Sequence, residues 1–274
     1  MLEEALRRYP DARDWIAGRL GEGCQCALLN DGEVNRSYLL EGAGERLVLR
    51  ARWAPEAPHG VDAAVERQVL RLIDGADFAP ETLLHGEGVW IYRYIEGEVP
   101  DGMAVRAPEM LEQIGALLRA VHDIKAPDLP SQYLPQVLAA MEERVARTLE
   151  RLGGDPVLRA GIERLRPKVA PAIEAWRAGS SLCHNDPHAG NLVRAPAGWK
   201  WLDWEYANRG STLLDSVYFC QQHSLTYEQS AIFLAAAGCG DAPDEEIHLM
   251  RLLAEYTDAM WTVLLPNPQP RQEG

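Results

Sequence analysis

The sequence SLCHNDPHAGNLVR at residues 181–194, followed by WLDWE at residues 201–205, breaks the helical pattern on either side of it. Two short apolar runs flank Ala-Pro-Ala-Gly at residues 195–198, which is typical of a tight turn between strands. We therefore expect a β-hairpin inside an otherwise helical region. Such a hairpin brings Asn191 and Asp203 close together in space.

The residue types in this segment suit phosphoryl transfer. Asn191 and Asp203 offer hard oxygen ligands for a magnesium ion, and Glu205, two positions on, faces the same way on an extended segment. Asp186 precedes Asn191 by five positions, which is the spacing between base and metal ligand in kinase catalytic loops. A carboxylate at this point can accept the proton of an attacking hydroxyl.

A zinc or iron hydrolase is an alternative interpretation of the same segment. His184, Asp186 and His188 alternate along it and could be metal ligands on an extended strand. That interpretation leaves Asn191 and the Asp203-x-Glu205 pair without a role. We therefore rank it below phosphoryl transfer.

The first third of the chain has the pattern of a β-rich lobe. Apolar residues alternate or run together between turn residues, and one stretch has helical spacing. We expect five antiparallel strands and one helix, with strands at residues 24–29, 36–41, 46–52, 83–84 and 89–92 and the helix at 62–73.

The remainder is mainly helical. The composition changes near residues 95–100, which we take as a lobe boundary, so the expected domains are 1–95 and 96–265, with a disordered tail at 266–274. The third expected helix is broken near Pro167 and Pro171. The expected helices span residues 108–124, 135–152, 157–178, 212–223, 227–237 and 244–265. The fold class is α+β.

Composition limits the classes of function. The chain has 274 residues, 47% hydrophobic and 25% charged, with a net charge of −14, which is the balance of a globular protein. We expect no nucleic-acid or membrane partner, because phosphate neutralisation needs clustered Lys and Arg and no apolar run approaches about 18 residues. The absence of a signal-peptide pattern and an odd count of five cysteines favour a cytoplasmic protein with reduced thiols.

These motifs resemble the aminoglycoside phosphotransferase and choline kinase superfamily, small-molecule relatives of protein kinases. His-Asn-Asp and Asp-Trp-Glu-Tyr-Ala look most like its choline kinase and bacterial thiamine kinase branch. The resemblance implies a protein-kinase-like two-lobe fold that uses ATP and Mg²⁺. It implies that Asp186 is the catalytic base, braced by His184, and that Asn191, Asp203 and Glu205 hold the metal.

The resemblance also assigns residues in the first lobe. Asn35 and Ser37 lie where the family binds phosphate. Arg50 takes the place of the protein-kinase lysine, and Glu66 on the following helix is its expected partner. Residues 92–95 would form the hinge that holds adenine, with Tyr92 and Tyr94. Asp215 matches a family position that is mainly structural, whereas His188 receives no role from the resemblance.

The expected reaction is transfer of the ATP γ-phosphoryl group to a hydroxyl of a small, cationic alcohol such as thiamine or choline. An aminoglycoside or sugar acceptor is the second hypothesis, and a catalytically inactive kinase-fold binding protein is a third, of another class. Glu255, Asp258 and Trp261 share a broad face of the last helix, where carboxylates and an aromatic ring could attract a cation. A solvated helix edge explains the same pattern.

Overall fold

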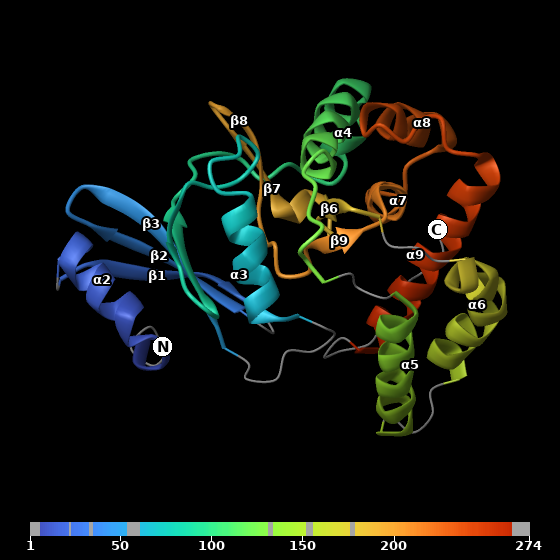
Figure 1. Ribbon diagram of the computed structural model, residues 1–274, viewed down its shortest axis with the longest axis horizontal. Helices are drawn as coiled ribbons and strands as arrows, with labels where there is room; N and C mark the ends of the chain where they lie inside the picture. The colour runs from blue at the N-terminus through green and yellow to red at the C-terminus, as the bar shows by residue number, and fades with distance from the viewer. Residues whose placement is uncertain are drawn as a thin grey trace. The chain divides into compact units, whose positions relative to one another are not determined.

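A computed structural model of the chain describes residues 6–21, 23–32, 35–53, 61–130, 134–151, 156–175 and 179–264. The chain divides into two compact units, which are each described by themselves (Figure 1). Unit 1 comprises residues 1–100 and 190–207, and unit 2 comprises 101–189 and 208–274. The tail expected at 266–274 lies outside the described residues.

Unit 1 is built on a five-stranded antiparallel sheet, which confirms the sequence prediction. Its spatial order is β1-β2-β3-β5-β4, so β5 pairs with β3, and β4 forms the edge of the sheet. Ser37 is the register partner of Arg50, which in turn pairs with Trp90. The strands are β1 (Gln25–Asp31), β2 (Asn35–Gly42), β3 (Glu45–Arg52), β4 (Thr82–His85) and β5 (Val89–Arg93).

Two helices lie on this sheet. Alternate residues of β3, including Leu47 and Leu49, pack in one apolar core with Ile16 and Leu20 of helix α2 (Pro10–Leu20). Arg50 lies between Leu49 and Ala51 on β3, so its side chain points to the face of the sheet opposite to Leu49. There it pairs with Glu66 of helix α3 (Ala63–Leu72). The side chain of Asp62 caps α3 by accepting the backbone N–H of residue 64. The sequence analysis did not predict α2.

The predicted hairpin at residues 192–201 is confirmed. It consists of β7 (Leu192–Ala195) and β8 (Gly198–Trp201), preceded by the 3₁₀ turn η3 (Ala189–Asn191). The segment 190–207 belongs to unit 1, whereas the sequence-based division placed it in the second lobe. The backbone N–H of Trp201 donates to the Phe78 carbonyl at 2.7 Å, and the Trp204 ring lies 5.8 Å from the Phe78 ring.

The described residues of unit 2 are mainly helical, with one short strand pair, β6 and β9, that the sequence analysis missed. Helix α9 packs against α5, α6 and α7, and α8 packs on α4. The elements are η2 (Ala104–Arg106), α4 (Pro108–His122), α5 (Leu134–Arg151), α6 (Pro156–Ala175), β6 (Ser181–Cys183), β9 (Asn208–Gly210), α7 (Thr212–Gln222), α8 (Tyr227–Ala236) and α9 (Asp244–Leu264). All six expected helices are present.

The expected break in the third of these helices is wrong. Helix α6 runs through both Pro167 and Pro171. A stripe of buried apolar side chains continues past both prolines and packs the helix along α9, and this packing offsets the hydrogen bonds that each proline removes. The stripe consists of Ile162, Leu165, Val169 and Ala172.

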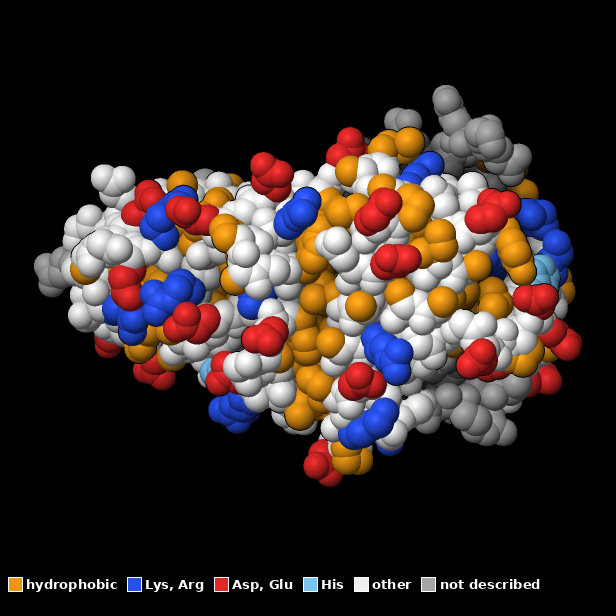
Figure 2. Space-filling view, turned by 90° about the horizontal axis from the view of Figure 1, so that it is seen from above, with side chains coloured by type: hydrophobic (Ala, Val, Ile, Leu, Met, Phe, Trp, Pro, Cys, Tyr) orange, Lys and Arg blue, Asp and Glu red, His pale blue; other side chains and the backbone are white. Residues whose placement is uncertain are grey.

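The surface shown in Figure 2 carries both charge signs interspersed rather than a single basic field. Among the described helices, none combines the length and the low charge that crossing a bilayer requires.

Candidate active site

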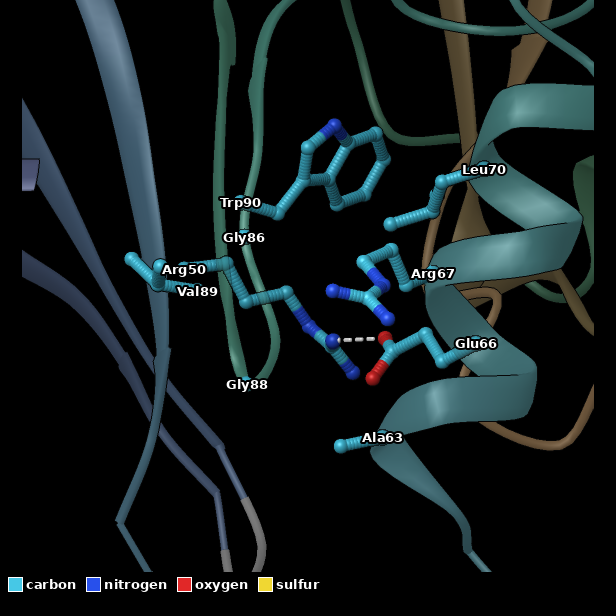
Figure 3. Close-up of a pocket in the computed structure, with 9 residues that line it drawn as sticks. All are labelled: Arg50, Ala63, Glu66, Arg67, Leu70, Gly86, Gly88, Val89 and Trp90. Atoms are coloured by element: carbon cyan, nitrogen blue, oxygen red, sulfur yellow. Dashed lines mark hydrogen bonds and ion pairs between the residues drawn. The ribbon is translucent and has the colours of Figure 1, made fainter. Parts of the chain in front are cut away.

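A buried arginine organises the acidic residues of unit 1. Arg50 on β3 is 6% exposed, and its guanidinium donates to the carboxylates of Glu66 and Asp203 and, at 2.8 Å, to Glu205. Figure 3 shows the pair formed with Glu66 across the gap between β3 and α3. Burial would by itself lower the pKa of Arg50, but the three carboxylates outweigh it and raise this pKa above its ordinary value.

The expected extended segment at residues 203–205 is instead a turn. Asp203 has a φ of +58°, in the left-handed region that Asp tolerates better than most residues. The Trp204 side chain is fully buried and donates its Nε1–H to the carbonyl of Trp201. This turn lets the two carboxylates that flank Trp204 reach the same guanidinium.

Glu205 carries an unusual proton affinity. Burial and the nearby Asp203 carboxylate raise the pKa of Glu205 to about 7, although Arg50 opposes this shift. The Asn35 side chain, itself buried, donates its Nδ2–H to a Glu205 carboxylate oxygen. One guanidinium thus faces three carboxylates.

This donor set fits a divalent cation. With all carboxylates ionised the cluster has a charge of 1 − 3 = −2, and its free oxygens are the hard ligands that Mg²⁺ prefers. The hairpin brings Asn191 to the same place, because its backbone carbonyl accepts the N–H of Leu202, the neighbour of Asp203, at 2.8 Å. Asn191, Asp203 and Glu205 are therefore the residues that could hold the metal.

Of the other predicted nucleotide-binding residues, Ser37 and Tyr92 lie on strands of the sheet and Tyr94 directly follows β5. Ser37 on β2 stands opposite Arg50. Tyr92 on β5 is buried against the Trp90 ring at 4.3 Å, and burial raises its pKa. Tyr94 packs its ring under the guanidinium of Arg46 at 4.2 Å.

Arg50 and Glu66 are among the residues that line the cavity of Figure 3, which measures about 10 Å³. That is room for about one water molecule, so this cavity is not a nucleotide site.

In unit 2, the predicted catalytic loop is anchored by Asp215 of α7. The Asp215 carboxylate is 2% exposed and accepts the backbone N–H groups of His184 at 2.9 Å and Asn185 at 2.8 Å. It also lies 2.9 Å from Nε2 of His122 on α4, a contact that the sequence analysis missed. The loop just before Asp186 is therefore fixed to a buried carboxylate.

The described residues give no support to the metallohydrolase alternative. His184, Asp186 and His188 do not gather as a group of three ligands there. The described residues do bring the ligand atoms of His122, Cys183 and Asp215 within 4.8 Å of one another. Both carboxylate oxygens of Asp215 already accept hydrogen bonds, so this group acts as a structural brace.

Asp186 itself is 31% exposed at its side chain, and its Oδ2 lies 3.4 Å from Nε2 of His188. Tyr218 of α7 lies near this carboxylate. Burial raises the pKa of Tyr218 well above its ordinary value, and the Asp258 and Asp186 carboxylates raise it further.

Asp258 is the one residue of the predicted acceptor face that the structure buries, at 6% exposure. Its Oδ1 accepts hydrogen bonds from the Tyr218 hydroxyl at 3.1 Å and from Nε2 of Gln222 at 2.9 Å. Glu255 and Trp261 are partly exposed on the same helix. The sequence analysis missed Tyr218 and Gln222, although their spacing of four on one helix would place them on one face.

Comparison with known proteins decides the family. Residues 25–253 match the phosphotransferase enzyme family (APH), which is more than half of the chain. The chain belongs to this family. The match includes both the Arg50 cluster and the loop that Asp215 anchors.

The relatives of this phosphotransferase-family chain include curated thiamine kinases. Those of Shigella boydii and Escherichia coli O157:H7 are each 29% identical to it over 187 residues, which is 68% of this chain. The aligned region spans 62% of the length of those relatives.

Solved structures share the kinase-like fold. The choline kinase LicA from Streptococcus pneumoniae matches with a TM-score of 0.67 at 16% identity, covering 94% of this chain and 89% of LicA. The choline kinase from Cryptosporidium parvum Iowa II matches with a TM-score of 0.69 at 14% identity, over 93% and 88% of the two chains. The ADP-bound aminoglycoside phosphotransferase APH(2'')-Ib matches with a TM-score of 0.63 at 14% identity, over 93% and 88%. The predicted fold class is confirmed.

Proposed function

We propose that this protein is an ATP-dependent kinase that phosphorylates a hydroxyl group of a small cationic alcohol, with thiamine as the first candidate. The observation that carries the proposal is the Arg50 cluster, in which one guanidinium faces Glu66, Asp203 and Glu205 and, with all three carboxylates ionised, leaves a charge of −2 for a cation to match. Kinases and ATPases bind Mg²⁺ through one or two carboxylates together with the phosphates of the nucleotide. The curated thiamine kinases that resemble the chain support the same reaction class.

Each residue of the motif has a chemical task in this proposal. Asn191 and Asp203, assisted by Glu205, hold Mg²⁺, which when bound supplies positive charge to the transferring phosphoryl group. Asp186 accepts the proton of the acceptor hydroxyl while the hydroxyl oxygen bonds to the γ-phosphorus of ATP; the bond from this phosphorus to the bridging oxygen breaks, and ADP leaves. His184 fixes the loop through its backbone N–H on Asp215.

The residues of the sheet bind the nucleotide in this proposal. Arg50, held by Glu66, contacts the phosphates together with Asn35 and Ser37. The segment that includes Tyr92 and Tyr94 holds the adenine.

The cationic nature of the acceptor is inferred from unit 2. Asp258 is a buried carboxylate that accepts a hydrogen bond from Tyr218. Tyr218 is also close enough to Asp186 for that carboxylate to raise its pKa. Negative charge near the base favours a positively charged acceptor, and Trp261 with Glu255 on α9 adds an aromatic face and a further carboxylate. A cation over an aromatic ring is stabilised by about 0.5–2 kcal/mol.

A screen of ADP formation tests the proposal. The protein with Mg²⁺ and ATP is mixed in turn with thiamine, choline, ethanolamine, an aminoglycoside and simple sugars, with the Asp186→Asn variant as the negative control. We expect turnover with thiamine or a similar cationic alcohol. Turnover with the aminoglycoside or a sugar alone would refute the proposed acceptor class, and turnover with none would favour the inactive binding protein.

A further inference from the structure

The catalytic loop is held at its far end as well as its near end, and the second anchor is a histidine. His223, at the C-terminal end of α7, is 7% exposed, and its Nε2 accepts the backbone N–H of Ala189 at 3.1 Å. Its ring packs on Phe219 of the same helix, with ring centroids 4.5 Å apart. Helix α7 therefore holds the loop on both sides of Asp186: Asp215 binds the backbone just before it, and His223 binds the backbone at Ala189 after it.

The protonation state of His223 suits this contact. Burial is the main cause that lowers the pKa of His223, and together with the electrostatic effects of His188 and Arg106 it brings this pKa to about 4. At neutral pH the ring is neutral, so Nε2 keeps the lone pair that the Ala189 N–H requires. A protonated Nε2 would be a donor and would lose this bond.

His188 lies between these two points in the chain. It directly precedes Ala189, so the bond to His223 limits the movement of its backbone. Its Nε2 lies 3.4 Å from Oδ2 of Asp186, which is close enough for an electrostatic contact with one oxygen of the carboxylate.

We propose that His188 and His223 are positioning residues for Asp186: His223 fixes the backbone beside His188, and the His188 imidazole orients the Asp186 carboxylate. The proposal rests on the role of Asp186 in the proposed function. The charged and titratable groups near this pair are the Asp186 carboxylate beside His188, Arg106 near His223, and Tyr218 with its partner Asp258 near Asp186. A base held in one orientation reacts faster than one that must be oriented in each turnover.

Paired substitutions test the two contacts in the full-length protein. At position 188, Gln keeps an N–H donor for Asp186, and Leu removes it. At position 223, Gln keeps an oxygen acceptor for Ala189, and Leu removes it. His248 is exposed on α9, and His248→Leu is the matched control.

The readouts are kcat, the KM for ATP and the melting temperature, measured with the best acceptor of the screen. We expect His188→Leu and His223→Leu each to lower kcat about tenfold with the KM for ATP changed less than twofold, and the Gln variants to recover most of that loss. The double Leu variant should lose about as much as either single one, because both act through one carboxylate.

Three results would overturn the proposal: full kcat in His188→Leu, Gln variants no better than Leu variants, or losses that multiply in the double variant. If His223→Leu does not fold, the His188 pair and His223→Gln decide the question. The Asp186→Asn variant separates this inference from the proposed function. Full activity in Asp186→Asn would refute the role of Asp186 as the base, and with it the proposed function. An inactive Asp186→Asn together with a fully active His188→Leu would refute only the positioning role of His188 and His223.

Discussion

Arg50 on β3 and Asp203 after β8 stand 153 positions apart in the chain, and the guanidinium of the first donates a hydrogen bond to the carboxylate of the second. The same guanidinium holds Glu66 and Glu205. One cation therefore balances carboxylates from two distant parts of unit 1, so its removal has a predictable cost.

Arg50→Met should destabilise the protein by about 3–5 kcal/mol at pH 8, because it leaves buried carboxylates without their counter-charge. The free energy of unfolding is measured by urea denaturation. Arg13→Met, at an exposed arginine on α2, is the control and should change stability by less than about 0.5 kcal/mol. A loss below 1 kcal/mol in Arg50→Met would contradict the central place of Arg50.

Glu205→Gln should remove a pH dependence of stability in metal-free buffer. The pKa of Glu205 is raised to about 7, whereas an unfolded glutamate has a pKa of about 4.3, so between these values the folded state binds more protons. The wild-type contribution is present at low pH and is lost as pH rises towards 7, at up to about 1.4 kcal/mol per pH unit.

Urea denaturation between pH 4.5 and 8 measures this slope. The Gln variant should lose less stability than the wild type as pH rises, and Glu112→Gln, at an exposed position of α4, should keep the wild-type slope. Equal slopes in wild type and Glu205→Gln would show that Glu205 titrates like an exposed carboxyl.

Asp186→Asn should lower kcat by roughly 10²–10⁴ and leave ATP affinity within twofold, because a general base acts mainly in the transition state. Steady-state kinetics and calorimetric ATP binding separate the two effects. Asp123→Asn, at an exposed aspartate after α4, serves as the control. A variant that keeps more than a third of the wild-type kcat would refute the assignment.

Asp258→Asn should raise the KM for a cationic acceptor about tenfold while the KM for ATP stays unchanged. The amide can still accept the hydrogen bonds of Tyr218 and Gln222, so the change removes mainly the negative charge. Trp261→Ala should act in the same direction, by about 2- to 30-fold for a cation–π contact of 0.5–2 kcal/mol. If neither variant moves the acceptor KM by more than twofold, the acceptor binds elsewhere.

Strong local patterns in the sequence were enough to predict most of the fold. The strands of the sheet alternate clearly, the turn at residues 195–198 is specific, and the hairpin it implies brings Asn191 beside Leu202 and Asp203. The ion pair of Arg50 and Glu66 is also present where the family resemblance put it. Short-range periodicity and the turn signal therefore sufficed for the sheet and the hairpin, and the family resemblance was needed for the ion pair.

What the sequence did not reveal depends on contacts distant in the chain. Helix α2 shows only a narrow apolar stripe of Ala12, Ile16 and Leu20, which becomes informative once the sheet is there to cover it. Asp203 adopts a left-handed backbone directly before the fully buried Trp204, and no local pattern in the sequence indicates this conformation. Helix α6 tolerates two prolines because α9 packs along it.

The contribution of residues 190–207 to unit 1 affects how the protein is made. The hairpin contacts Phe78, because the backbone N–H of Trp201 donates to the Phe78 carbonyl. During synthesis the first hundred residues leave the ribosome before this hairpin has been made. The β-rich unit therefore cannot complete its core until about half of the helical unit has also been translated. Contacts of such long sequence separation slow folding and leave apolar surface of unit 1 exposed until the hairpin is made. We therefore expect chaperones to bind mainly to nascent chains shorter than about 210 residues.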